Sequence, residues 1–236
     1  MKIARFIKWS YRTLVPASVR QTDMARRIKS AIVPHQILYD DTYYAESVDT
    51  GAVKAAGPIS RFVVENMNPR TVIDVGCGTG AIAVGFREAG CRVVGLEYST
   101  VGLQYCRERG LDVQKFDLEN DHYQDLGLEK FDLVVSTEVA EHLPPALADR
   151  YADILSGLSD RIFMTAAVPG QGGVDHVNEQ PHSYWIEKFE HRGFSYNDTL
   201  SETARHELGS KSDVAKWYSQ NIMIFENTKA IQSDAI

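Results

Sequence analysis

The chain contains only three cysteines, which limits the roles that sulfur can have in it. Cys77, Cys91 and Cys106 do not show the paired spacing of a structural metal site, and three thiols cannot all form disulfides with one another. Few and unpaired cysteines are typical of proteins from a reducing compartment. We therefore expect a cytoplasmic protein.

A long apolar run is also absent. No stretch approaches the roughly eighteen uninterrupted apolar residues of a transmembrane helix, and the N-terminus lacks the apolar segment of a secretory signal. With 236 residues and 44% hydrophobic side chains, the chain can still bury a full core. The sequence therefore predicts a soluble protein, or one that is peripheral to the inner face of a membrane.

Charge is unevenly distributed along the chain. The formal net charge is −7, but residues 1–35 hold eight Lys or Arg against the single Asp23, so this arm carries +7 and the rest −14. An acidic body disfavours binding to nucleic acid. The arm mixes basic with apolar residues, as amphipathic helices at membrane surfaces do. The alternatives are a helix that caps a substrate cleft or a homodimer contact, with its cations merely solvated.

From residue 71 onward, apolar strand-like runs alternate with amphipathic helical segments. Such alternation is typical of an α/β fold with a parallel sheet and right-handed crossovers. The expected strands are 71–75, 92–96, 112–115, 131–135, 161–166, 194–199 and 221–226, and the expected helices are 53–67, 79–89, 100–109, 145–156, 182–192 and 202–216. We expect three parts: the basic arm 1–35, one domain over 36–227, and a flexible tail at 228–236.

A glycine-rich turn follows the first of these strands. The run 72–80 ends in Gly76, Gly78 and Gly80, which let the main chain turn tightly and approach a ligand closely. Glu97 ends the next strand, at the position where doubly wound folds hold ribose hydroxyls. The glycine spacing differs from the dinucleotide fingerprint, which positions a pyrophosphate. A nucleoside without phosphate fits this turn better.

In these motifs the sequence resembles the class I S-adenosylmethionine-dependent methyltransferases. Asp117 after the third strand, the fourth strand 131–136 and the segment 137–143 follow in the order of that family. The resemblance implies a Rossmann-like seven-stranded, mostly parallel sheet with an antiparallel C-terminal strand and helices on both faces. It also implies S-adenosyl-L-methionine as cofactor, held by Asp74, Gly76, Cys77, Gly78, Gly80, Glu97, Tyr98, Asp117, Leu118 and Thr137.

Within that resemblance, each part of the cofactor has expected partners. Asp74 and the glycine backbone would hold the methionine portion, Glu97 the ribose and Asp117 the adenine amino group. Tyr98 would stack on the adenine, or would be only a surface aromatic next to the motif.

Acidic and imidazole side chains gather after the fourth strand. Glu138, Glu141 and His142 have helical spacing, so one helical turn would place them on one face. With His176 from a later Gly-rich loop, they form a ligand set suited to Mg²⁺ or another divalent metal. The set resembles that of metal-dependent small-RNA 2′-O-methyltransferases, although quinone methyltransferases share the Glu-x-x-Glu-His segment.

Two alternatives to a metal site remain. The carboxylates could cap a helix N-terminus while His142 packs at the cleft edge. Alternatively, His142 or His176 could act as a general base without a metal. We expect His142, His176 and Glu138 to be catalytic, and Glu138, Glu141, His142 and His176 to be the metal ligands if an ion binds.

The segment from Asp175 to Trp185 and the later Lys216-Trp217-Tyr218 resemble bacterial methyltransferases of sugars and surface polysaccharides. Aromatic rings beside amides suit a sugar site, although Tyr184, Trp185 and Trp217 could instead form core. The sequence therefore predicts an O-methyltransferase of a sugar or glycan hydroxyl. The alternatives are a methyltransferase of a quinone, polyketide or amine, a terminal 2′-O-methyltransferase of RNA, and an inactive cofactor-binding regulator. The intact acidic and histidine motifs argue against the regulator.

Overall fold

The computed structural model describes residues 49–229. The predicted basic arm 1–35 and residues 230–236 of the predicted tail lie outside these residues. Within 49–229, no helix combines the length and the apolar character that crossing a bilayer requires. All three cysteines are buried and none forms a disulfide.

Helices and strands alternate along the described chain as the sequence predicts. The strands are β1 Thr71–Val75, β2 Arg92–Glu97, β3 Asp112–Lys115, β4 Leu133–Thr137, β5 Arg161–Thr165, β6 Phe194–Tyr196 and β7 Ile222–Asn227. The α-helices are α6 Thr50–Met67, α7 Ala81–Glu88, α8 Thr100–Glu108, α9 Ala148–Leu158, α10 His182–Glu190, α11 Asp198–Gly209 and α12 Lys216–Gln220. Short 3-10 turns are η2 Tyr123–Leu126, η3 Ala140–His142 and η4 Pro145–Leu147.

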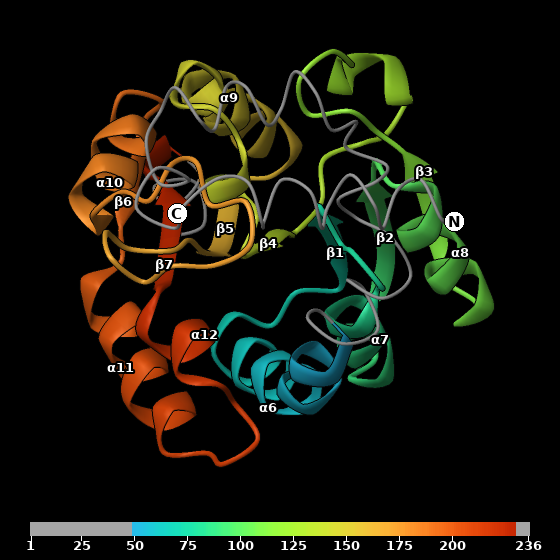
Figure 1. Cartoon of the computed structure of the whole chain (residues 1–236), viewed down its shortest axis with the longest axis horizontal. Coiled ribbons are helices and arrows are strands. Elements are labelled where there is room, and N and C mark those ends of the chain that lie inside the picture. Colours follow the sequence, from blue (N-terminus) through green and yellow to red (C-terminus); the bar gives the residue numbers. More distant parts are fainter. Residues whose placement is uncertain (1–48, 230–236) are drawn as a thin grey trace, which may run out of the picture.

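The strands form one sheet in the order β3-β2-β1-β4-β5-β7-β6 (Figure 1). Strands β1 to β5 pair in parallel, and β7 is antiparallel to both of its neighbours, β5 and β6. This confirms the predicted Rossmann-like sheet with an antiparallel C-terminal strand. The order in which strands are added to the sheet reverses between β1 and β4, and ligands of doubly wound sheets bind at such a point.

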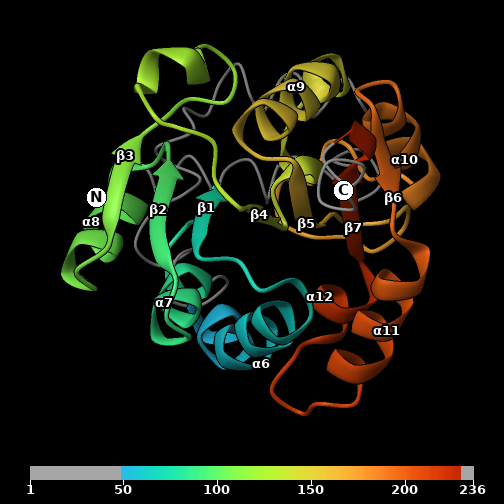
Figure 2. The same cartoon turned by 180° about the vertical axis from the view of Figure 1, so that it is seen from behind.

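Each face of the sheet is covered by its own layer of helices. Neighbouring residues of a strand point to opposite faces, so Val72 packs in one buried cluster and Ile73 in the other. The first cluster includes side chains from α6, α7 and α11, and the second includes side chains from α9 and α10. Figures 1 and 2 both show α11 and α12 beside α6, with α9 and α10 on the other side. Both faces of the central strands are therefore buried.

Two predicted helical segments differ from the structure. The predicted helix 202–216 is two helices, α11 and α12, separated by a turn at residues 210–215. The predicted helical turn beginning at Glu138 is also wrong. Glu138 has a left-handed backbone with φ +54°, and its N–H donates to Thr165 at the end of β5. Because this N–H extends the strand pairing, helical geometry begins only at η3.

Candidate functional site

A cavity of about 570 Å³ opens at the carboxyl ends of the parallel strands. Its lining comes from the segments that follow β1 to β5, together with Ala52 of α6 and Trp217 and Tyr218 of α12. The volume lies within the range of small-molecule and cofactor sites. One hollow therefore collects the motifs that the sequence spreads over more than a hundred residues.

The glycine turn forms one wall of the cavity. Gly76 and Cys77 donate their N–H groups to the carbonyl of Leu96, which ties the turn to the end of β2. Gly76 has a φ of +74°, and a Cβ at this position would lie 2.6 Å from a methyl of Val139. Gly76, Cys77 and Gly78 line the cavity, whereas Gly80 is not among the lining residues and packs against Leu111. A side chain at Gly76 would thus push into the segment after β4.

Glu97 lies at the end of β2, where the sequence predicts the ribose ligand. Its two carboxylate oxygens accept hydrogen bonds from the N–H groups of Gly78 at 2.8 Å and Ser99 at 2.7 Å. A carboxylate has further lone pairs, so these bonds leave room for hydroxyl donors. Gly102, which the sequence reasoning missed, lets the carboxylate lie there, because a Cβ would come within 2.9 Å of the Glu97 Cγ.

Asp74 is buried below the turn and is not among the lining residues. Burial and, as the second cause, the nearby Glu97 charge raise the pKa of its carboxyl to about 7. One of its oxygens has no hydrogen-bond partner among the described residues. Its predicted role at the methionine portion stays a prediction.

The other predicted cofactor residues line the same cavity. Tyr98 is partly exposed there, with the Lys115 ammonium 5.6 Å from its ring centroid. Asp117 accepts hydrogen bonds from the backbone of Glu119 and the side chain of Asn120, so a turn fixes its carboxylate. Leu118 and Thr137 complete this set.

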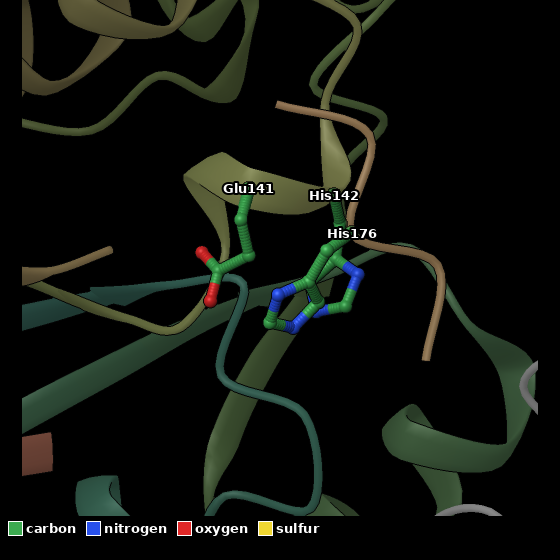
Figure 3. A group of neighbouring side chains, drawn as sticks. All are labelled: Glu141, His142 and His176. Atoms are coloured by element: carbon green, nitrogen blue, oxygen red, sulfur yellow. The ribbon is translucent and has the colours of Figure 1, made fainter. Parts of the chain in front are cut away.

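Glu141, His142 and His176 come together at the other end of the site (Figure 3). Each offers one ligand atom, and these atoms all lie within 4.8 Å of one another. The two imidazoles meet edge to face, with ring centroids 5.1 Å apart. The structure thus joins three of the four predicted metal ligands.

Glu141 is fully buried, whereas the two histidines are partly buried. Neither of its oxygens has a hydrogen-bond partner among the described residues. Burial raises the pKa of this carboxyl well above its ordinary value, and the Glu138 charge raises it further. A buried carboxylate without donors is costly unless a cation or a proton satisfies it.

Glu138 is close enough to Glu141 to affect its pKa but is not one of the three convergent side chains. Its oxygens accept hydrogen bonds from the side-chain amides of Gln171 at 3.2 Å and Asn221 at 3.4 Å. Glu138 and Gln171 both line the cavity. The structure therefore places Glu138 at the cavity wall, in an amide network, and not in the group with the two histidines.

Backbone hydrogen bonds explain how His176 reaches the group. The N–H groups of Val177 and Asn178 both donate to the carbonyl of Glu141, at 2.8 and 3.0 Å. Asn178 is itself buried. The loop after β5 is thus fixed to η3 at the residue that carries the buried carboxylate, a link for which the sequence contains no signal.

Aromatic residues of the C-terminal region divide between the core and the cavity. Trp185 is fully buried in the core, whereas Trp217 is 48% exposed and lines the cavity. Val174, 41% exposed, also lines it. The cavity therefore has an accessible apolar rim beside its polar groups.

Comparison with known proteins agrees with this arrangement. Residues 73–156 match the family described as "Methyltransferase domain". The chain is 30% identical over 112 residues to the ubiquinone biosynthesis O-methyltransferase of Hydrogenovibrio crunogenus, covering 44% of this chain and 46% of the relative. It is 34% identical over 84 residues to the enzyme of that name from Alkalilimnicola ehrlichii, covering 34% of each. The chain thus matches less than half the length of these relatives.

Solved structures show the same fold. The magnesium protoporphyrin IX methyltransferase of Synechocystis with bound SAH has a TM-score of 0.56 at 16% identity, covering 88% of this chain and 94% of the other. An amino pentose methyltransferase from Micromonospora echinaspora has a TM-score of 0.57 at 15% identity, covering 80% and 96%. Residues 73–156 therefore match a methyltransferase domain, and the described chain has the fold of these solved methyltransferases.

Proposed function

We propose that the protein is an S-adenosylmethionine-dependent O-methyltransferase of a small acceptor. The observation that carries this proposal is the single cavity that joins the glycine turn and Glu97 to Glu138, His142 and His176. A cofactor on the turn would direct its methyl group toward the carboxylate and imidazole groups. The matches to O-methyltransferases support this reaction.

The chemistry needs positioning and one base. The acceptor oxygen attacks the methyl carbon, the carbon–sulfur bond breaks, and the sulfur keeps the electron pair as S-adenosylhomocysteine forms. Holding the two partners in line supplies most of the acceleration. If no metal binds, the hydroxyl proton passes to a base, for which we propose the imidazole of His176 or His142, because imidazole is a common general base near neutral pH. Glu138 would orient the hydroxyl.

The acceptor that fits best is a hydroxylated aromatic molecule. Trp217 and Val174 supply an apolar rim beside the polar groups, and a flat ring could pack against it. Relatives named for ubiquinone biosynthesis support a small aromatic acceptor. A sugar hydroxyl, predicted above, is the second candidate, because the amide of Gln171 lines the same cavity as Trp217.

Glu141, His142 and His176 fit a divalent metal. Two imidazoles and one carboxylate are a common donor set, and the unpartnered oxygens of Glu141 would be satisfied by a cation. Such an ion would lower the pKa of a bound acceptor hydroxyl. Glu138 is not part of this proposed set.

An acceptor panel tests the proposed function. Formation of S-adenosylhomocysteine is measured with a catechol, a sugar nucleotide and a short RNA. We expect turnover with the catechol, and turnover with only the sugar nucleotide would favour the second candidate. Turnover with only RNA, or tight cofactor binding with no turnover, would contradict the proposal.

Trp217→Ala tests the aromatic rim. We expect kcat/KM for the catechol to fall at least about tenfold, because stacking and burial of a ring contribute on the order of 1.5 kcal/mol. The control is Val53→Ala, since Val53 is 51% exposed but is not among the residues that line the cavity. Equal effects of the two changes would exclude a rim role for Trp217.

A further inference from the structure

A further carboxylate, that of Glu179, holds the loop of His176. One oxygen of Glu179 accepts hydrogen bonds from Nδ1 of His176 at 3.0 Å and from the N–H of Gly172 at 2.8 Å. The other oxygen accepts from the N–H of Gly170 at 2.9 Å. Three donors from one loop therefore converge on a single, mostly buried side chain.

Two glycines aim their N–H groups at this carboxylate. Gly170 has a φ of +87° and Gly172 a φ of +70°, and residues that carry a side chain rarely adopt either value. The left-handed backbone at both positions shapes the loop around Glu179. The two glycines of this loop are therefore explained by its structure, because their N–H groups bind the Glu179 carboxylate.

The same contact determines which ring nitrogen of His176 carries the proton. An ionised carboxylate only accepts hydrogen bonds, so Nδ1 must be the donor. In the neutral imidazole, Nε2 is then left with its lone pair. Because Nδ1 is used by Glu179, Nε2 is the nitrogen that His176 can offer to the group with Glu141 and His142.

The edge of the His176 imidazole away from Glu179 is also held in place. A Cβ at Gly173 would lie 2.2 Å from Nε2 of His176, so only glycine leaves room for the ring in this position. The imidazole is thus fixed between the Glu179 carboxylate and the bare backbone of Gly173.

We propose that Glu179 is a positioning residue, which holds His176 in the tautomer with Nδ1 protonated and Nε2 directed to the reaction. The consequence for activity rests on the proposed function, because it requires His176 to act as base or ligand. The tautomer itself does not depend on that function. A carboxylate that orients an imidazole in this way typically changes activity or metal affinity by about 10–100-fold.

Imidazole nitrogen NMR of the whole protein, in the absence of acceptor and metal, tests the tautomer. The pH is kept well above the ordinary imidazole pKa of about 6.5, and His176→Ala identifies the signals. We expect a protonated Nδ1 and an unprotonated Nε2 in the parent protein. Glu179→Ala should move His176 toward the Nε2-protonated form, whereas Glu179→Gln, which keeps an acceptor oxygen, should retain the parent pattern.

The result that overturns the proposal is an unprotonated Nδ1 in the parent protein, or a His176 spectrum that Glu179→Ala leaves unchanged. Methyl-transfer assays add the functional arm: we expect kcat to fall about 10–100-fold in Glu179→Ala and less in Glu179→Gln, with cofactor affinity unchanged. Glu202→Ala, at an exposed position of α11, is the control. The expected NMR result without turnover on any acceptor would leave the positioning intact and contradict the proposed function instead.

Discussion

The imidazole of His142 meets that of His176 edge to face, although 33 residues separate them in the chain. Their meeting depends on the carbonyl of Glu141, which accepts the N–H groups of Val177 and Asn178. Two backbone hydrogen bonds therefore bring the second histidine to the first. This relationship makes the loop after β5 a part of the site.

Gly173→Ala should displace the His176 ring without removing it. The added Cβ would meet the ring at 2.2 Å, and the flexible end of the side chain can move away while the backbone stays. If His176 is the base, we expect kcat to fall within the roughly 10²–10⁴-fold range of general-base catalysis. Titration calorimetry should show unchanged affinity for S-adenosylhomocysteine. The control is Gly57→Ala, where a Cβ meets nothing within 4 Å. Equal activity of the two variants would show that His176 has no role in the reaction.

Glu97→Ala should weaken cofactor binding at least about tenfold. The change removes a charged acceptor for the ribose, and hydrogen bonds to charged groups contribute about 1.5–3 kcal/mol. It also frees the N–H of Gly78, so thermal unfolding must be measured beside calorimetry. Glu88→Ala, at the exposed end of α7, is the control. A stable Glu97→Ala protein that binds the cofactor as tightly as the parent would disprove the ribose assignment.

Glu141→Gln should reduce the bound metal. The change replaces an oxygen donor by an amide in a buried position and keeps the shape of the side chain. After incubation with Mn²⁺, Co²⁺ or Zn²⁺ and desalting, elemental analysis should find less metal in the variant than in the parent, with cofactor affinity unchanged. Glu187→Gln, exposed on α10, is the control. A parent protein that retains no ion and is insensitive to chelators would support the histidine base without a metal.

Asp74 should make stability depend on pH. The folded protein holds its proton up to a pKa of about 7, whereas the ordinary value is 3.8. Between these values the folded state binds more protons, so the free energy of unfolding falls as pH rises, by at most about 1.4 kcal/mol per pH unit. Asp74→Asn has no carboxyl group at this position and therefore does not take up or release this proton. Urea unfolding should therefore show the parent losing stability relative to the variant over that pH range; a constant difference would argue against a buried, titrating Asp74.

Removal of residues 1–35 should leave the domain able to bind cofactor. These residues carry the +7 charge and precede the described domain. Sedimentation with anionic vesicles should show binding by the full chain, weakened by salt, and none by the shortened chain. If both chains bind equally or neither binds, the predicted membrane contact is wrong.

Much of the fold follows from local patterns in the sequence. Strands β1 and β2 can be predicted because they are apolar runs. The glycines that follow the first run predict a tight turn. Glu97 was identifiable because its position at a strand end is a local property. Gly102 was not, since only packing shows that its missing side chain makes room for Glu97.

The sequence by itself determined the sheet, the cofactor turn and the types of residue that could do chemistry. Only the tertiary structure decided which of them meet. Spacing predicted that Glu138 would join Glu141 and His142 as a ligand, but its N–H pairs with Thr165 and its carboxylate accepts from the amides of Gln171 and Asn221. Glu179 has no pattern that marks it, because its role comes from three donors in a loop without periodicity. Local periodicity reports which face a side chain shares with its neighbours in the chain, whereas the candidate site was assembled by hydrogen bonds between distant segments.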